Sequence, residues 1–372
     1  MKRQKRIFLS PPWVGAEERA AVARAFDSGY VAPCGPMVDA FEQAIAAAAG
    51  RRYAVAVSGG TAAIDLLMEE FGVDATWTVF APTLTFIATV GPAYHRGAKI
   101  VFVDSDATGN MDVALLERAL ADATRRRPRA RTSRLLVLGV DLYGRCCDYD
   151  AIAELCEKYG AVYINDSAES VGSSYRERPA GSSGVAAVYS FNGNKIITTS
   201  GGGAIVTDDK GIADRARKRS QQSREPFPWY QHEEVGFNYR MSNLLAAVGL
   251  AQLEKLPRIR TIRQLILAHY MQALAGNRRY AFLTTPADES NYWLSVVLTK
   301  GRTVRDRLLK RFAAADIEAR PVWKPLHLQP VFRGCRVYGG KVAESLFTRG
   351  LCLPSGTGMT ARDLARVTRE MA

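Results

Sequence analysis

The sequence predicts an α/β fold in which a mainly parallel sheet is covered by helices on both faces. Short apolar runs alternate with segments of helical periodicity over the first two-thirds of the 372 residues, and such alternation is typical of parallel sheets. The chain is too long for one small core and suits a large domain with a smaller one attached. We therefore expect a large domain over residues 1–245 and a small C-terminal α+β domain over residues 246–372.

The expected strands of the large domain are short apolar runs. They cover residues 53–57, 78–81, 99–103, 135–141, 161–166, 185–191 and 203–206. Between them, apolar residues recur at helical spacing over 38–49 and 152–156. Thr83 or Thr85 can cap a helix that begins beside them, and Asp148 precedes the next helix. Because ligands of such sheets bind outside the carboxyl ends of the strands, we expect the functional residues there.

The C-terminal third is expected to form the smaller domain. Helical patterning from about 241 to 270 predicts one long helix or a broken pair, since Pro257 cannot donate a backbone hydrogen bond. A strand over 292–298, a helix over 304–314 and a closing helix over 361–371 follow.

The net charge of +13 favours anionic partners. Part of this charge lies in an arginine-rich run over residues 124–134, ahead of an expected buried strand. The run has neither interleaved aromatic residues nor a recognisable reading helix, so we do not expect nucleic acid as a partner. A small molecule that carries a diphosphate fits the charge at least as well.

The cysteines and the N-terminal segment indicate a reducing compartment. The six cysteines form no CxxC pair, and four histidines provide no zinc spacing, so no metal site is expected. The first residues are basic, but the apolar stretch after them is only a few residues long. Neither a signal peptide nor a membrane span follows from it, and we expect a cytoplasmic protein.

A lysine between two apolar runs is the strongest candidate for chemistry. Lys195 lies between the runs 185–191 and 204–206, with small residues and glycines on both sides. Such surroundings can leave an amine poorly solvated and therefore nucleophilic toward an aldehyde. Asp166 ends an expected strand, where a carboxylate can keep a heteroaromatic nitrogen protonated. Taken alone, a solvated lysine and a turn aspartate are the commoner cases.

Three further features accompany these two residues. Gly60 and Thr61 follow an expected strand and open a helix, a geometry that directs backbone N–H groups at an anion. Ser190 offers a hydroxyl at another strand end, and Phe86 can lie flat against a ring, although a place in a helix core is equally compatible with it. Together these residues predict a pyridoxal-phosphate site, because they provide an amine, a carboxylate for a ring nitrogen, an anion-binding turn and a stacking face.

The sequence resembles the DegT/StrS family of nucleotide-sugar aminotransferases from about residue 8 to its C-terminus. The resemblance is carried, in the family order, by residues 58–63, 82–89, 166–172, 190–195, 236–243 and 321–327. It implies the fold-type I arrangement of pyridoxal-phosphate enzymes, with a mainly parallel mixed sheet flanked by helices. Relatives often have a serine at the position of Gly59, so one possible phosphate-binding hydroxyl is missing here.

The resemblance also implies roles for individual residues. Lys195 would bond to the cofactor aldehyde and later act as general base and acid in a proton shift. Asp166 would pair with the pyridinium nitrogen, while Gly60, Thr61 and Ser190 would hold the phosphate.

Further roles follow from the same resemblance. Phe86 would stack on the cofactor ring, and Glu169 would lie close to the ring face or its phenolic oxygen. Asn238 is expected to reach the phosphate of the neighbouring subunit, which implies a homodimer with shared active sites. The residues expected to help line the sugar-nucleotide pocket are Trp323, Lys324 and His327.

The segments 7–12, 30–36 and 222–226 are similar to one branch of the family. This branch transfers the amino group of L-glutamate, through pyridoxamine phosphate, to C4 of UDP-4-keto-6-deoxy-N-acetylglucosamine in the bacillosamine route. The alternative is a GDP-perosamine synthase or another 4-keto or 3-keto nucleotide-sugar aminotransferase. A non-catalytic regulator on the same fold is a more distant alternative. Lys195 itself argues against the relatives that carry histidine there and catalyse dehydration.

Overall fold

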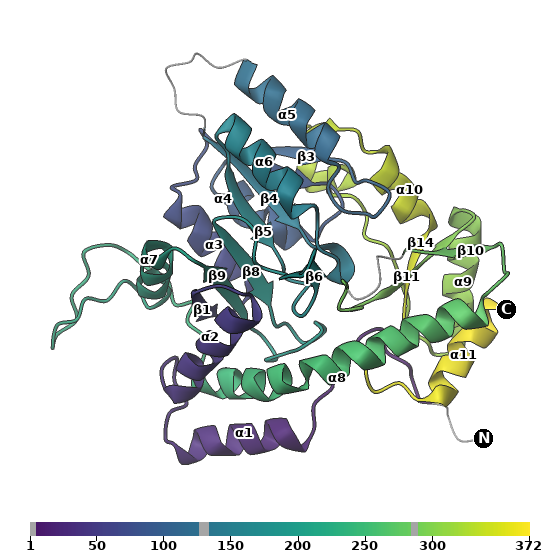
Figure 1. Cartoon of the computed structure of the whole chain (residues 1–372), viewed down its shortest axis with the longest axis horizontal. Helices are drawn as coiled ribbons and strands as arrows, with labels where there is room; N and C mark the ends of the chain where they lie inside the picture. The colour runs from purple at the N-terminus through teal and green to yellow at the C-terminus, as the bar shows by residue number, and fades with distance from the viewer. Residues whose placement is uncertain (1–4, 126–133, 284–288) are drawn as a thin grey trace.

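The computed structural model describes residues 5–125, 134–283 and 289–372 (Figure 1). Most of the arginine-rich run over 124–134 therefore lies outside the described residues. None of the helices in these three ranges combines the length and the hydropathy needed to cross a bilayer.

A large sheet of eight strands forms the centre of the described chain. In spatial order its strands are β1 (Tyr53–Val57), β9 (Gly203–Thr207), β8 (Ala186–Ser190), β5 (Val162–Asp166), β4 (Leu135–Val140), β2 (Thr78–Pro82), β3 (Lys99–Val103) and β13 (Arg336–Tyr338). All strands of this sheet except β9 run in the same direction, so the prediction of a mainly parallel sheet is confirmed. The seven strands predicted for this sheet agree with the observed ones to within about one residue at each end, whereas β13 was not predicted. In the C-terminal part, the strand expected over 292–298 begins three residues later, at Ser295, because Tyr292 adopts a positive φ that reverses the backbone.

Helices cover both faces of this sheet, because alternate residues of each strand point to opposite sides. One face packs against α3 (Gly60–Glu70), α4 (Gly91–His95) and α7 (Lys210–Ser220). The other face packs against α2 (Pro36–Ala48), α5 (Val113–Arg125) and α6 (Tyr149–Tyr159). The hairpin of β6 (Ser174–Tyr175) and β7 (Arg178–Pro179) lies apart from the sheet.

A smaller antiparallel sheet lies toward the C-terminus (Figure 1). Its strands, in spatial order, are β10 (Tyr280–Phe282), β11 (Ser295–Thr299), β14 (Gly350–Leu353) and β12 (Arg320–Pro321). The helices of this part are α9 (Arg302–Ala314), α10 (Lys341–Arg349) and α11 (Ala361–Met371). The chain arrives there along α8 (Asn243–Ala273), against which α1 (Ala16–Asp27) packs.

The structure decides between the alternatives of one local expectation and corrects another. The helix α8 is continuous through Pro257, since buried Leu256 and Ile259 hold it against the core on both sides of the proline. The segment after β2 forms a 3₁₀ turn, Ile87–Thr89, and then α4, and neither Thr83 nor Thr85 caps a helix. Their hydroxyls bond other side chains instead, those of His327 and Thr89.

The expected domain boundary after residue 245 falls in the first turn of α8 and stays a prediction. Among the contacts that cross it are two between extended segments of the backbone. The strand β13 comes from the C-terminal part and pairs with β3 of the large sheet. Near the other end of the chain, Ile7 forms a parallel bridge with Ile317. The two parts are therefore joined through β13 and the N-terminal segment as well as through α8.

Candidate active site

The parallel strands β1, β2, β4, β5 and β8 end at one edge of the large sheet, and a cavity of about 1070 Å³ opens there. Residues from the C-terminal part complete its walls. The predicted site residues that line it are Gly60, Thr61, Phe86, Asp166, Glu169, Ser190, Lys195, Trp323 and Lys324.

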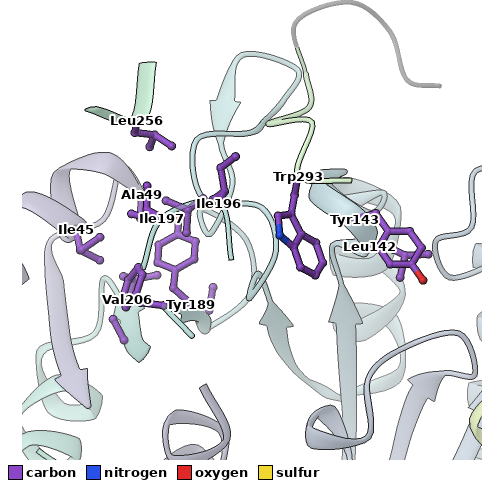
Figure 2. Close-up of a cluster of buried hydrophobic side chains, with 14 of the residues drawn as sticks. Ile45, Ala49, Leu142, Tyr143, Tyr189, Ile196, Ile197, Val206, Leu256 and Trp293 are labelled. Carbon is purple, nitrogen blue, oxygen red and sulfur yellow. The ribbon is translucent and has the colours of Figure 1, made fainter. Parts of the chain in front are cut away.

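Lys195 lies in the loop between β8 and β9, with its amine in the cavity wall. Its Nζ is 3.0 Å from Oε1 of Glu169, and the two side chains are 13% and 4% exposed. The same Nζ lies over the ring face of Trp293, 4.5 Å from the centroid. The following residues, Ile196 and Ile197, are buried in the core, where Figure 2 shows them among the other apolar side chains. The amine is thus held between a carboxylate and an aromatic face by a well-anchored loop.

Glu169 accepts a hydrogen bond from the backbone in addition to the one from Lys195. Its Oε2 accepts from the N–H of Tyr143 at 2.8 Å. Tyr143 adopts a φ of 53°, which is uncommon for a residue with a large side chain. Burial raises the pKa of Glu169, while the neighbouring Lys195 charge and the Tyr143 bond lower it. The pair with Lys195 therefore offsets part of the cost of burying the carboxylate.

Asp166 ends β5 at the floor of the cavity and is buried. Its Oδ2 accepts from the hydroxyl of Thr89 at 2.7 Å, and its Oδ1 accepts from the N–H of Ala168 at 3.2 Å. Burial raises the pKa of Asp166, whereas the Thr89 bond and the charge of Lys195 lower it. A protonated ring nitrogen facing this carboxylate would stabilise its ionised form further.

The turn between β1 and α3 can bind an anion. The first N–H groups of α3, at Gly60 and Thr61, have no partner within the helix and point to the cavity edge. The antiparallel strand β9 passes directly beneath this turn. A Cβ on Gly203 would lie 2.5 Å from the carbonyl carbon of Gly59, and a Cβ on Gly60 would lie 3.1 Å from that of Ser190. The close approach brings the Ser190 hydroxyl beside the free amides.

Aromatic side chains form another wall of the cavity. Phe86 is 56% exposed, and its ring centroid lies 5.8 Å from that of Trp323. The ring of Tyr143 lies 5.0 Å from Trp323 and 6.2 Å from Trp293, and Figure 2 shows the last pair side by side. Lys324 lines the cavity beside Trp323 and is exposed. The wall therefore offers flat apolar faces and a cation at its rim.

Two predicted site residues lie elsewhere. His327 does not line the cavity; its Nδ1 bonds the Thr83 hydroxyl at 2.6 Å, and its Nε2 lies 3.3 Å from Oε1 of Glu344. Asn238 is exposed and forms a bridge with Gln221, away from the cavity of its own chain. Their expected roles in substrate and cofactor binding stay predictions.

Other residues of the site were not found from the sequence. Thr89, the partner of Asp166, falls in a segment that carries the family resemblance, so its position could have indicated it. Trp293 and the wall segment 8–12 are far from Lys195 in sequence, and no local pattern connects them with it. Their proximity depends on the packing of the C-terminal part against the large sheet.

The donor groups fit pyridoxal phosphate. A lysine amine, a buried carboxylate at a strand end and free amides beside a serine hydroxyl all face one cavity. They match the aldehyde, ring nitrogen and phosphate of that cofactor. Among the described residues, no group of three or more His, Cys, Asp or Glu side chains could hold a metal ion.

Comparison with known proteins agrees with this chemistry. The profile of the DegT/DnrJ/EryC1/StrS aminotransferase family matches residues 12–372. EpsN of Bacillus subtilis strain 168, which its name describes as a pyridoxal phosphate-dependent aminotransferase, is 43% identical over 370 residues, or 98% of this chain and 94% of EpsN. A GDP-perosamine synthase of Caulobacter vibrioides is 36% identical over 367 residues, or 97% of this chain and 96% of that protein.

Solved structures share the fold. The aminotransferase TlmJ of Streptoalloteichus hindustanus superposes with a TM-score of 0.89 at 28% identity, covering 98% of this chain and 97% of TlmJ. A DegT DnrJ EryC1 StrS aminotransferase of Brucella abortus gives a TM-score of 0.86 at 29% identity, over 95% and 94% of the two chains.

Proposed function

Because the chain belongs to the DegT/DnrJ/EryC1/StrS aminotransferase family, we propose that it aminates C4 of UDP-4-keto-6-deoxy-N-acetylglucosamine with L-glutamate as donor. The general activity, before any sugar is specified, is that of a pyridoxal phosphate-dependent nucleotide-sugar aminotransferase. The observation that carries the proposed chemistry is the position of Lys195 in the cavity, 3.0 Å from Glu169 and within reach of the groups suited to the cofactor.

Each residue of the site has a distinct part in this proposal. Bound pyridoxal phosphate supplies an electrophilic aldehyde and a ring that withdraws electrons from the carbon losing its proton. Lys195 would take a proton from the substrate carbon that bears the nitrogen and deliver it to the cofactor carbon on the other side of that nitrogen, a 1,3-shift. Asp166 keeps the ring nitrogen protonated, and its burial strengthens that interaction. Gly60 and Ser190 bind the phosphate at the start of α3.

Glu169 prepares Lys195 for proton transfer. Its carboxylate accepts a hydrogen bond from Nζ at 3.0 Å and restricts the rotation of the long side chain. Because Glu169 is itself fixed by the N–H of Tyr143, the amine has a defined place before any substrate binds. Phe86 and Trp323 provide flat apolar faces on one side of the cavity.

The choice of a UDP-linked sugar rests on the wall segment 8–12. This segment belongs to a stretch that is similar to the enzymes of the bacillosamine route, and it lines the cavity. Arg320 and Lys324 lie at the same cavity and provide positive charge for a diphosphate. The second candidate is a GDP-linked 4-keto-6-deoxy sugar, favoured by the GDP-perosamine synthases among the relatives.

We also propose a homodimer whose active sites are shared. The connection between α7 and α8 extends away from the rest of the chain (Figure 1) and carries exposed apolar side chains. These are Phe227, Trp229, Tyr230 and Val235. Exposed apolar groups of this kind are typical of surfaces that are covered by another chain. Asn238 follows them and is itself exposed, so it is free to reach a neighbouring subunit.

The first experiment measures 2-oxoglutarate released from L-glutamate by the pyridoxal phosphate-loaded protein. Parallel reactions contain UDP-4-keto-6-deoxy-N-acetylglucosamine, GDP-4-keto-6-deoxymannose or no acceptor. We expect sustained release with the UDP-linked sugar and a single turnover without acceptor. The variant Lys195→Ala should bind the cofactor and give no turnover, because the proton carrier is absent.

Each result separates one part of the proposal from the others. Sustained release with only the GDP-linked sugar would keep the aminotransferase and replace the acceptor. Release with neither sugar, although the protein reacts once with L-glutamate, would reject both acceptors. Normal turnover by Lys195→Ala would contradict the role of this lysine.

A further inference from the structure

A fully buried arginine in α8 has no part in the chemistry described so far. Arg263 is 1% exposed. Its Nη1 donates to the carbonyl of Trp293 at 2.6 Å and to the hydroxyl of Ser10 at 3.1 Å, and its Nε donates to the hydroxyl of Thr357 at 3.2 Å. All these acceptors are uncharged. Burial lowers the pKa of Arg263 to about 9, with no opposing contribution from a nearby carboxylate.

Such a placement costs free energy, because a buried cation is normally offset by a carboxylate. Within the three described ranges, no carboxylate forms an ion pair with Arg263. What the guanidinium provides instead is several donors in a rigid plane, which can join separate segments of chain. Here it joins the N-terminal segment, the residues before β11 and the residues after β14.

Two partners of Arg263 converge on the residue before the catalytic lysine. The hydroxyl of Ser10 donates to the carbonyl oxygen of Asn194 at 3.0 Å, and the indole N–H of Trp293 donates to the same oxygen at 2.7 Å. The carbonyl thus has two donors for its two lone pairs. A closed ring of hydrogen bonds therefore joins Arg263, Ser10, Asn194 and Trp293. Lys195 is the next residue after Asn194 in the chain.

The turn over residues 291–293 also holds Glu169, the partner of Lys195. The side-chain amide of Asn291 donates to the carbonyl of Glu169 at 2.8 Å, and its Oδ1 accepts from the N–H of Trp293 at 2.9 Å. Between Asn291 and Trp293, Tyr292 adopts a φ of 57°, so the backbone reverses sharply there. Because the ring of Trp293 also lies under Nζ of Lys195, this turn supports both members of the Lys195–Glu169 pair.

We propose that Arg263 is a positioning residue for Lys195, acting through the carbonyl of Trp293 and the hydroxyl of Ser10. The inference rests on the proposed role of Lys195 as proton carrier. Arg263 does not line the cavity and touches neither cofactor nor substrate. Its loss should therefore loosen the amine without removing any side chain that lines the cavity.

The test compares Arg263→Met with Arg366→Met in the full-length protein. Arg366 is a matched control, because it is also buried and its guanidinium also donates to backbone carbonyls, at 2.8 Å for Lys5 and 2.9 Å for Ala315. It does not line the cavity. Two quantities are measured: the fraction of pyridoxal phosphate attached to Lys195 after borohydride reduction, by peptide mass spectrometry, and kcat and KM for L-glutamate.

We expect Arg263→Met to attach less cofactor at limiting concentration and to lower kcat about tenfold with little change in KM. A displacement of about 1 Å at a reacting group is enough for such a loss. Trp293→Phe keeps an aromatic face and removes only the donor to Asn194, so it should lower both quantities by less. Arg366→Met should keep the wild-type attachment and kcat.

Equal values for Arg263→Met and Arg366→Met in both measurements would overturn the proposal. If Arg263→Met does not fold, Trp293→Phe and Ser10→Ala replace it in the test. Wild-type cofactor attachment and wild-type kcat in both of these variants would overturn the proposal. A wild-type protein that attaches cofactor to Lys195 and does not react with L-glutamate would contradict the proposed donor. The attachment measurement would then still decide the role of Arg263.

Discussion

The carboxyl group of Asp166 depends on the hydroxyl of Thr89 for one of its hydrogen bonds in a buried site. The bond is 2.7 Å long, and Thr89 is in turn bonded to the hydroxyl of Thr85 at 2.8 Å. A buried carboxylate is stable in its ionised form only when such donors and nearby cations offset its desolvation. The protonation of this one residue decides whether it can hold a protonated ring nitrogen.

Replacing Thr89 by valine should therefore change the pH dependence of the reaction. Burial raises the pKa of Asp166 and the Thr89 bond opposes it, so removing the bond should raise that pKa further. The ionised form is lost as pH falls, and the acid limb of the kcat profile should move to higher pH. On that limb we expect a rate about tenfold lower, because a hydrogen bond to a charged group contributes roughly 1.5 kcal/mol or more.

The matched control for this variant is Thr89→Ser, which keeps the hydroxyl. Its profile of kcat against pH should follow that of the wild-type protein. An unshifted acid limb in Thr89→Val would mean that Thr89 does not control the ionisation of Asp166.

At the scale of elements, the site depends on the one antiparallel strand of the large sheet. The strand β9 pairs with β1 on one side and with β8 on the other, and Gly203 is opposite both Val57 and Ser190. It therefore lies beneath the turn that leads into α3. A side chain at this position would meet backbone atoms of Gly59 and Gly60, which cannot rotate away. The geometry of the anion-binding turn requires a glycine in a neighbouring strand.

We expect Gly203→Ala to weaken pyridoxal phosphate binding and to lower the free energy of unfolding by about 1–3 kcal/mol. The added methyl group would lie 2.5 Å from the carbonyl carbon of Gly59, and overpacking of this kind has roughly that cost. Cofactor affinity is followed by absorbance titration and stability by thermal unfolding. In the control Gly193→Ala the nearest atom is 3.7 Å away, so both quantities should stay near those of the wild-type protein. Equal affinities in the two variants would show that β9 does not shape the phosphate site.

At the scale of the whole molecule, the cavity lacks the one predicted cofactor ligand that the family resemblance assigns to a neighbouring subunit. Asn238 is exposed and lies away from the cavity of its own chain. The aromatic side chains before it, Phe227, Trp229 and Tyr230, are also 40%, 58% and 79% exposed. A second copy would satisfy both features, since an isologous contact exchanges the same residues in both directions.

Mixing two inactive variants tests this arrangement. In a mixed dimer of Lys195→Ala and Asn238→Ala, one site carries both substitutions and the other carries neither. If half of the dimers are mixed and each has one intact site, roughly a quarter of the wild-type activity should return. The measurement is 2-oxoglutarate release after co-refolding, with each variant alone as control. Mixed dimers without any gain in activity would place Asn238 outside the partner's site.

The sequence by itself determined seven of the eight strands of the large sheet and the residues at the strand ends. Strand ends are local features, because apolar runs stop where Asp166 and Ser190 begin the polar loops. A parallel sheet then brings such ends to one edge, so their meeting in one cavity followed from the fold class. His327 and Asn238 were named by resemblance alone, and neither lies at the cavity of its own chain.

Only the tertiary structure decided how the lysine is held. Trp293, Ser10 and Arg263 come from distant parts of the chain, and their hydrogen bonds depend on how the N-terminal segment, the small sheet and α8 pack against the large sheet. No periodicity or local motif records such contacts. The physical reason is that a buried polar group must find its partner wherever the packed chain provides one, and sequence distance does not limit that choice.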